Sequence, residues 1–201
     1  MRVMAHEVDA LLAALARPAR RSSDFDLNPA LPLPPGRVLR PAAVLVAIQP
    51  RPAGARLILT KRASHLKHHP GQIAFPGGKQ DQGDADLAAT ALREAWEEIG
   101  LPPEQVEIMG MLAPHETVTG FTMTPILGLV RDDFTPKVDP EEVEEMFTVP
   151  LAHVLDPARY RVEGRVWRGT MRRYYAVPYG PYYIWGATAR ILRGLAERVR
   201  G

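Results

Sequence analysis

Three glutamates are spaced so that a helix would place their carboxylates on one face. The segment 86–99 is rich in strong helix formers and contains no glycine or proline, which predicts a helix. On that helix Glu94, Glu97 and Glu98 occupy positions i, i+3 and i+4. Because carboxylates at this spacing repel one another, we expect a cation among them. Their hard oxygen ligands favour Mg²⁺ or Mn²⁺. These residues alone leave a solvated acidic helix face as the alternative.

Residues with defined roles mark the ends of this helix. Asp84 and Asp86 stand before it, where a capping side chain and negative charge are favourable. Gly100 and the two prolines that follow predict its end. Arg93 flanks the acidic residues, and we expect it to orient Glu97 at i+4.

The segment 93–101 reads Arg-Glu-Ala-Trp-Glu-Glu-Ile-Gly-Leu and resembles the Nudix box, the signature of a large family of diphosphate hydrolases. The usual form is Gly, five residues, Glu, seven residues, then Arg-Glu-(apolar)-x-Glu-Glu-x-Gly-(apolar). The second half matches here residue for residue. Counted from Gly78, the first half has Asp84 in place of Glu, and eight residues instead of seven separate it from Arg93. In the family that first acid is mainly structural, so the departure affects the loop rather than the chemistry.

The resemblance implies a fold and a set of metal ligands. The Nudix fold is an α/β/α sandwich with a mixed β-sheet, in which the box forms a loop-helix-loop. The matching positions imply Glu94 and Glu98 as the principal ligands of Mg²⁺ or Mn²⁺. Glu97 and the Gly78 carbonyl are expected to join them.

The resemblance also implies the reaction, a metal-assisted attack of water on the phosphorus of a diphosphate. The expected catalytic residues are Glu97, Glu98 and Arg93. A glutamate must accept the proton of the water. Glu97 is our first choice for this base. The family places the base either in the box or on a later loop, so Glu142 and Glu145 are the alternatives.

A second motif lies directly before the box. Residues 59–78 resemble the additional signature of the coenzyme A pyrophosphatase subgroup, in which Leu-Leu-Thr-x-Arg and a basic stretch precede Gly-Gln-x-x-Phe-Pro-Gly-Gly. Ile58 stands in place of the first leucine. The implied substrate is coenzyme A or its thioesters, cleaved to 3′,5′-ADP and 4′-phosphopantetheine or its acyl form. The alternatives are hydrolysis of NADH, ADP-ribose or nucleoside triphosphates, and a non-catalytic nucleotide-sensing Nudix module.

Coenzyme A carries a diphosphate and a 3′-phosphate, so its pocket needs cations besides the metal. Arg62 directly follows a predicted strand, which fixes its direction, and Lys67 lies in the same basic segment. Glycines at such a site let the backbone approach a phosphate closely. The expected substrate-binding residues are therefore Arg62, Lys67, Gly71, Gln72 and Gly77.

Composition limits the remaining possibilities. The chain has 201 residues, a net charge of +2 and no cysteine. The small and interspersed charge argues against nucleic acid as a partner, and no apolar run predicts a membrane span or signal peptide. We expect a cytoplasmic protein, a monomer or homodimer, that binds a small-molecule diphosphate resembling coenzyme A.

We expect a single Nudix hydrolase domain over residues 1–201, with an N-terminal helix and extended arm at 1–40 and a catalytic core at 41–201. The hydrophobic pattern predicts helices at 6–17, 86–99, 150–155 and 184–199. It predicts strands at 42–48, 56–60, 106–112, 123–130, 143–149, 159–166 and 172–177. The segment 18–41 is expected to lie over the domain as an arm, and 61–75 to form a loop. Strands around a central helix indicate a mixed sheet between helices.

Overall fold

The computed structural model describes residues 2–31, 36–167 and 169–201. Its helices are α1 (Arg2–Ala16), α2 (Leu87–Ile99), α3 (Leu151–Val154) and α4 (Gly186–Arg200), with short 3-10 helices η1 (Pro103–Gln105) and η2 (Pro157–Arg159). Its strands are β1 (Ser22–Ser23), β2 (Arg40–Gln49), β3 (Arg56–Arg62), β4 (Ile73–Ala74), β5 (Gly77–Lys79), β6 (Val106–Met111), β7 (His115–Glu116), β8 (Phe121–Val130), β9 (Val143–Pro150), β10 (Arg161–Trp167) and β11 (Thr170–Ala176).

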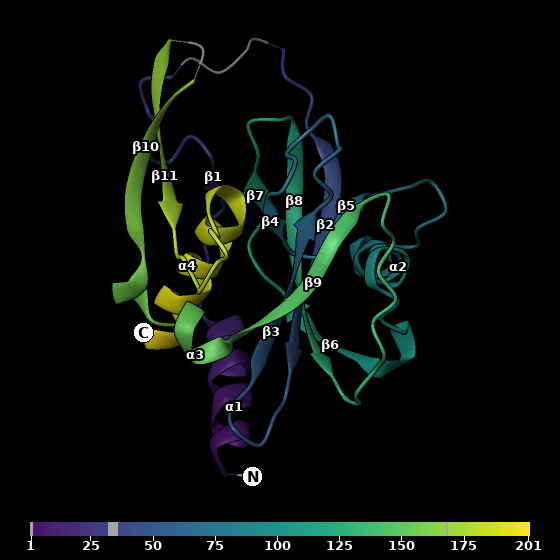
Figure 1. Cartoon of the computed structure of the whole chain (residues 1–201). Helices are drawn as coiled ribbons and strands as arrows, with labels where there is room; N and C mark the ends of the chain where they lie inside the picture. Colours follow the sequence, from purple (N-terminus) through teal and green to yellow (C-terminus); the bar gives the residue numbers. More distant parts are fainter. Residues whose placement is uncertain (1, 32–35, 168) are drawn as a thin grey trace.

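A mixed sheet is built around β2. This strand runs parallel to β8 and antiparallel to both β3 and β5, and β9 continues the sheet beyond β3. Residues 42–49 of β2 are all buried, as expected for a strand that is covered on both faces. β10 and β11 pair with each other in a separate two-stranded sheet. Their hairpin stands to one side of the main sheet (Figure 1).

Helices cover both faces of the main sheet (Figure 1). On one face α2 packs its alanines and Ile99 against Leu45 of β2 and Ile58 of β3. On the other face α1 and α4 pack against a larger cluster that includes Val44 and Val46 of β2. Alternate residues of β2 thus enter two different cores. The expected α/β/α sandwich with a mixed sheet is confirmed.

The predicted elements are present, with shifted ends. The first helix begins earlier than expected, at Arg2, and the last begins later, at Gly186. The expected loop 61–75 was partly wrong, because Lys61 pairs with Ile73 and so extends β3 against the two-residue strand β4. The expected arm lies over the domain through β1, which pairs with β7, although residues 32–35 fall outside the described ranges.

No helix in the described part of the chain combines the length and the apolar character needed to cross a bilayer.

Candidate active site

α2 carries the predicted acidic face and is capped at both ends. The Asp86 carboxylate accepts a hydrogen bond from the Ala89 N–H at 2.8 Å, which satisfies a free donor of the first turn. Gly100 adopts a left-handed conformation with φ of 67°, and its N–H donates to the Trp96 carbonyl. The caps fix where the helix begins and ends, and therefore which residues face the sheet.

Arg93 holds the loop before α2 against the helix. Its Nε donates to Asp84 Oδ1 at 2.9 Å and its Nη2 to Asp84 Oδ2 at 3.0 Å. The Asp84 side chain is only 6% exposed. The Arg93 guanidinium holds the pKa of this carboxyl well below its usual range. Thr90 Oγ1 also donates to Asp84. The shorter acid in the first half of the box therefore forms a paired, structural contact.

Arg93 also contacts two glutamates of the box. Its Nη1 lies 2.9 Å from Glu97 Oε2, which confirms the expected contact at i+4. Its Nη2 lies 3.0 Å from Glu94 Oε1. One guanidinium thus orients the loop and two of the three carboxylates of the helix.

Gly77 and Gly78, the first two residues of β5, leave no room for a side chain. A Cβ at Gly78 would lie 2.5 Å from Glu94 Oε1, and a Cβ at Gly77 would overlap the backbone of Val44. Gly77 also has a φ of 151°, which other residues rarely adopt. Any larger residue at these two positions would displace the Glu94 carboxylate or the edge of β2.

Glu98 is nearly fully buried, with 3% of its surface exposed. Its Oε2 accepts one hydrogen bond, from the Gly77 N–H at 3.3 Å. Burial raises the pKa of this carboxyl to about 8, and the negative charges of Glu94 and Glu142 add to the effect. Burial also raises the pKa of Glu94, which Arg93 partly offsets. A divalent cation bound beside Glu94 and Glu98 would stabilise the ionised form of both carboxylates.

A third carboxylate joins them from the segment before β9. One carboxylate oxygen from each of Glu94, Glu98 and Glu142 lies within 4.8 Å of the other two. Backbone hydrogen bonds place Glu142, because the Asp139 N–H donates to the Glu98 carbonyl at 3.0 Å and the Ala63 N–H to the Glu142 carbonyl at 2.9 Å. We call these three residues the carboxylate cluster. Its oxygen donors and excess negative charge fit a hard divalent cation such as Mg²⁺ or Mn²⁺.

The other candidate acids lie outside the carboxylate cluster. Glu97 is 55% exposed at its side chain and is paired with Arg93. Glu145 accepts a hydrogen bond from the Tyr182 hydroxyl at 2.5 Å, and Glu144 forms an ion pair with Lys61 at 2.6 Å. From the sequence, Glu142 was predicted only as an alternative to Glu97 for the general base. Its membership of the cluster depends on a loop whose course had no signal in the hydrophobic pattern.

The basic segment after β3 folds back on itself beside the carboxylate cluster. The Arg62 N–H donates to the Gln72 carbonyl at 3.0 Å, and the Gly71 N–H donates to the Arg62 carbonyl at 3.1 Å. Gly71 has a φ of 68°, which favours glycine at this turn. The hydrogen bond from Gly77 and the positive charge of Arg62 both lower the pKa of Glu98, against the larger effects of burial, Glu94 and Glu142. The Lys67 side chain is exposed.

The fold and the carboxylate cluster define a class of protein. A NUDIX domain model matches residues 38–167, and the chain therefore belongs to the Nudix hydrolase family. The enzymes of this family act on phosphorus-containing anhydrides, including the diphosphate linkages of nucleoside diphosphate derivatives, and they generally use divalent metal ions.

Curated relatives carry the same family name. The chain is 46% identical over 160 residues to the "Uncharacterized Nudix hydrolase NudL" of Enterobacter sp. (strain 638), covering 80% of this chain and 83% of the relative. It is 44% identical over 160 residues, with the same coverage, to the protein of that name from Salmonella paratyphi B. The crystal structure of the MutT protein from Methanosarcina mazei Go1 shares the fold at a TM-score of 0.51 and 19% identity, covering 82% of this chain and 95% of that one.

Proposed function

We propose that this Nudix hydrolase cleaves the diphosphate of coenzyme A or its thioesters, giving 3′,5′-ADP and 4′-phosphopantetheine or its acyl form. The observation that carries the proposal is the position of the segment 62–72, whose sequence resembles the coenzyme A pyrophosphatase signature. Its first residue, Arg62, ends β3, and the N–H of the next residue, Ala63, donates to the carbonyl of Glu142 of the carboxylate cluster at 2.9 Å. A cation at that position is suited to a substrate with a phosphate beyond its diphosphate.

In the proposed site, Glu94 and Glu98 hold Mg²⁺ or Mn²⁺, with the Gly78 carbonyl as a further ligand beside Glu94, and the Glu142 carboxylate lies next to the ion. The bound ion supplies positive charge at the diphosphate and activates water for attack on phosphorus. Arg93 keeps Glu94 in position through their contact at 3.0 Å. The buried Glu98 is the ligand whose charge depends most on the ion, because its surroundings favour the protonated form.

We assign the general base to Glu142 in place of Glu97. A base must reach the water that attacks phosphorus, and Glu142 contributes an exposed carboxylate at the carboxylate cluster. The Glu97 carboxylate accepts a hydrogen bond from Arg93 and is not part of that cluster. Glu97 then acts on the site through Arg93, as a residue that positions its neighbours.

Arg62, Gly71, Gln72 and Gly77 are proposed to bind the substrate through one charged side chain and a turn of backbone next to the cluster. Lys67 is proposed to contribute its charge from the exposed part of the same segment. A non-catalytic nucleotide-sensing module is the weaker candidate, since three mutually repelling carboxylates offer no advantage without an ion.

The test is a comparison of substrates with identification of the products. Purified protein with Mg²⁺ or Mn²⁺ would be assayed on coenzyme A, an acyl coenzyme A, NADH, ADP-ribose and a nucleoside triphosphate. We expect the highest kcat/KM for coenzyme A or its thioester, with 3′,5′-ADP as a product. A higher kcat/KM for NADH, ADP-ribose or the triphosphate would reject the coenzyme A assignment, and no activity on any of them would favour the sensing module.

A further inference from the structure

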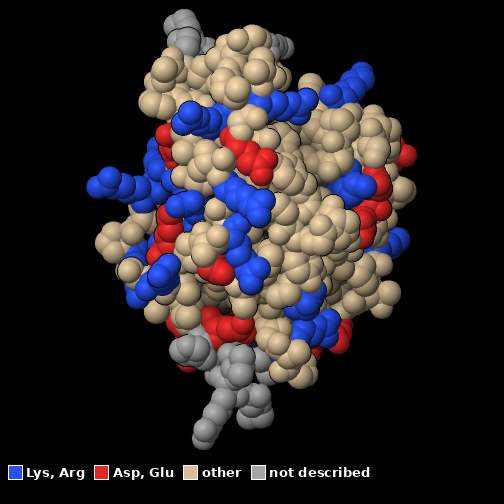
Figure 2. All heavy atoms as spheres, turned by 60° about the vertical axis from the view of Figure 1, so that its left-hand side comes forward, with Lys and Arg blue, Asp and Glu red and all other residues tan. Residues whose placement is uncertain are grey.

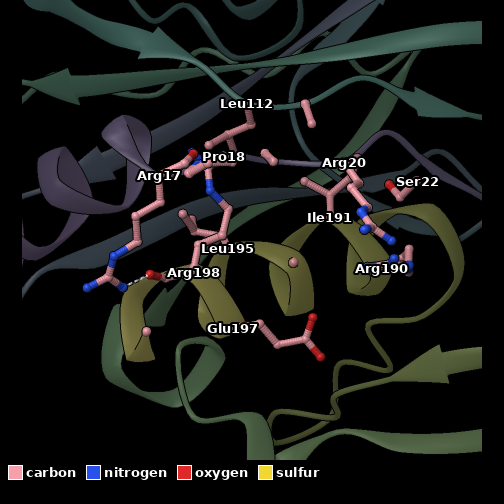
Figure 3. A pocket seen from close by; sticks show the side chains of 14 residues that line it. Arg17, Pro18, Arg20, Ser22, Leu112, Arg190, Ile191, Leu195, Glu197 and Arg198 are labelled. Carbon is pink, nitrogen blue, oxygen red and sulfur yellow. Dashed lines mark hydrogen bonds between the residues drawn. The ribbon is translucent and has the colours of Figure 1, made fainter.

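A pocket lies between the N-terminal arm and α4, on the face of the sheet opposite α2 (Figure 3). Its volume is about 430 Å³, which is within the range of small-molecule sites. Residues 17–20 and Ser22 form one wall, and residues of the segment from Arg190 to Gly201 form the other. None of the residues assigned above to the active site lines it.

The pocket is rich in arginine. Four arginines line it, Arg17, Arg20, Arg190 and Arg198, together with one acid, Glu197. The wider face that carries α4 and the β10–β11 hairpin has acidic side chains placed among its basic ones (Figure 2). Inside the pocket, basic side chains outnumber acidic ones by four to one.

Two of these arginines hold the structure together. Arg17 donates to the carbonyls of Arg198 and Val199, at the end of α4. Arg198 donates in return to the carbonyls of Leu15 and Arg17, at 3.0 and 2.9 Å. These contacts join the arm to the last turn of α4, where cations are favourable. They leave the other two arginines as candidates for binding a ligand.

Arg20 and Arg190 carry two positive charges, and among the described residues only one carboxylate, Asp26, is paired with them. Arg190 reaches Asp26 Oδ2 through both its Nε and its Nη2, each at 2.9 Å. In the described part of the chain Arg20 makes no hydrogen bond or ion pair. Figure 3 shows both guanidinium groups at the end of the pocket near Ser22, while Glu197 points away from them. Of these two guanidinium groups, Arg190 is paired with a carboxylate and Arg20 is the one that remains open to an anion.

An apolar wall adjoins this charged end. Leu112, Ile191 and Leu195 line the pocket between its two pairs of arginines (Figure 3). Guanidinium groups bind phosphate oxygens by paired hydrogen bonds, and an apolar wall accepts the organic part of a ligand. We propose that the pocket binds a small phosphate monoester with an apolar body, its phosphate between Arg20 and Arg190.

The test uses phenyl phosphate as the probe, with inorganic phosphate and phenol for comparison. Binding to the full chain would be measured by calorimetry in the presence of EDTA, so that no metal holds phosphate at the carboxylate cluster. We expect saturable binding of phenyl phosphate, weaker binding of inorganic phosphate and no binding of phenol. Added salt should weaken the binding of phenyl phosphate, because the contact is electrostatic.

Variants then locate the probe. Arg20→Gln should weaken binding about three- to tenfold, since it removes an exposed charge without removing a hydrogen bond or ion pair among the residues that the structure describes. Arg20→Lys keeps the charge and should lose less. Arg21→Gln is the matched control, because Arg21 is also exposed but does not line the pocket. Its affinity for the probe should stay close to that of the wild type.

Three results would overturn the proposal. The first is the absence of saturable binding at millimolar phenyl phosphate. The second is an equal loss of affinity in Arg20→Gln and Arg21→Gln, which would indicate general attraction to a basic surface. The third is an unchanged affinity in Arg20→Gln together with a loss in Arg62→Ala, which would place the probe at the active site.

Discussion

The Arg93 guanidinium donates two hydrogen bonds to the carboxylate of Asp84, nine residues earlier in the chain, at 2.9 and 3.0 Å. Asp84 stands where the Nudix box usually has glutamate, and one extra residue separates it from the arginine. The loop absorbs the insertion and still brings the shorter acid into contact. Because the same arginine contacts Glu94 and Glu97, this pair links the shape of the loop to the carboxylates of the helix.

Removing the charge of Asp84 should therefore destabilise the protein. Asp84→Asn leaves the Arg93 guanidinium without its main partner, and we expect a loss of about 2–3 kcal/mol in the free energy of unfolding. Asp81→Asn is the control, because Asp81 lies 3.8 Å from Arg93 and its side chain is 57% exposed. Chemical denaturation of both variants measures the difference. Equal stabilities would mean that the Asp84 contact contributes little.

The metal-free protein should lose stability as the pH rises. The pKa of Glu98 is raised to about 8 by burial and by Glu94 and Glu142, from an ordinary value of 4.5. The folded state therefore holds a proton that the unfolded state releases, and the stability associated with it is lost between about pH 4.5 and pH 8. The loss should reach a few kcal/mol, at about 1.4 kcal/mol per pKa unit.

Glu98→Gln tests this directly, because glutamine has nearly the same shape and does not ionise. In EDTA the variant should match the wild type near pH 5 and become the more stable of the two near pH 8. Denaturant unfolding at several pH values measures both. A constant difference between the two proteins across this range would contradict the assignment of the raised pKa to Glu98.

Metal binding should offset the loss of stability that the ionised Glu98 carboxylate causes. With Mg²⁺ or Mn²⁺ present, the wild type should gain melting temperature, because an ion that binds only the folded state stabilises it by RT ln(1 + [L]/Kd). The Glu94→Gln, Glu98→Gln double variant should gain much less. Each single variant should also reduce turnover by orders of magnitude while keeping its fold. Equal thermal shifts in both proteins would place the ion elsewhere.

The residues of the helix were predictable, and the third carboxylate was only partly so. A helical period over 86–99 is a local signal, and it correctly predicted the helix and the contact between Arg93 and Glu97. Glu142 reaches the carboxylate cluster only because the segment before β9 makes backbone hydrogen bonds to Ala63 and to the end of α2. Such contacts between distant segments leave no period in the sequence.

The same reason explains the other differences from the predicted fold. β1 and β7 have two residues each and are defined by their pairing with distant segments. β1 pairs with β7, at Ser22 with His115 and at Ser23 with Glu116, and β7 also pairs with β8. Strands this short show no alternation of apolar residues. The large elements were visible in the sequence because each buries a continuous apolar face, as residues 42–49 of β2 do.

If Glu142 is the general base, its substitution should lower kcat more than the substitution of the other candidate acids. Glu142→Gln should lower kcat by about two orders of magnitude or more, because it removes the proposed proton acceptor at the carboxylate cluster. Glu145→Gln is the matched control on the same segment, since Glu145 is hydrogen-bonded to Tyr182. Glu97→Gln should lower kcat less than Glu142→Gln does. Steady-state kinetics of the three variants would reject the assignment if Glu97→Gln were the most impaired.

The most direct test of the proposed function concerns the 3′-phosphate. The measurement is kcat/KM of the wild type and of Arg62→Ala on coenzyme A and on dephospho-coenzyme A, with Arg165→Ala, an exposed arginine of β10, as the control. We predict that the wild type uses coenzyme A roughly ten- to a few hundred-fold more efficiently than dephospho-coenzyme A, because charge-assisted hydrogen bonds to the 3′-phosphate are lost in the dephospho form. Arg62→Ala should narrow this gap, whereas Arg165→Ala should preserve it. Equal efficiency of the wild type on the two compounds would contradict the account.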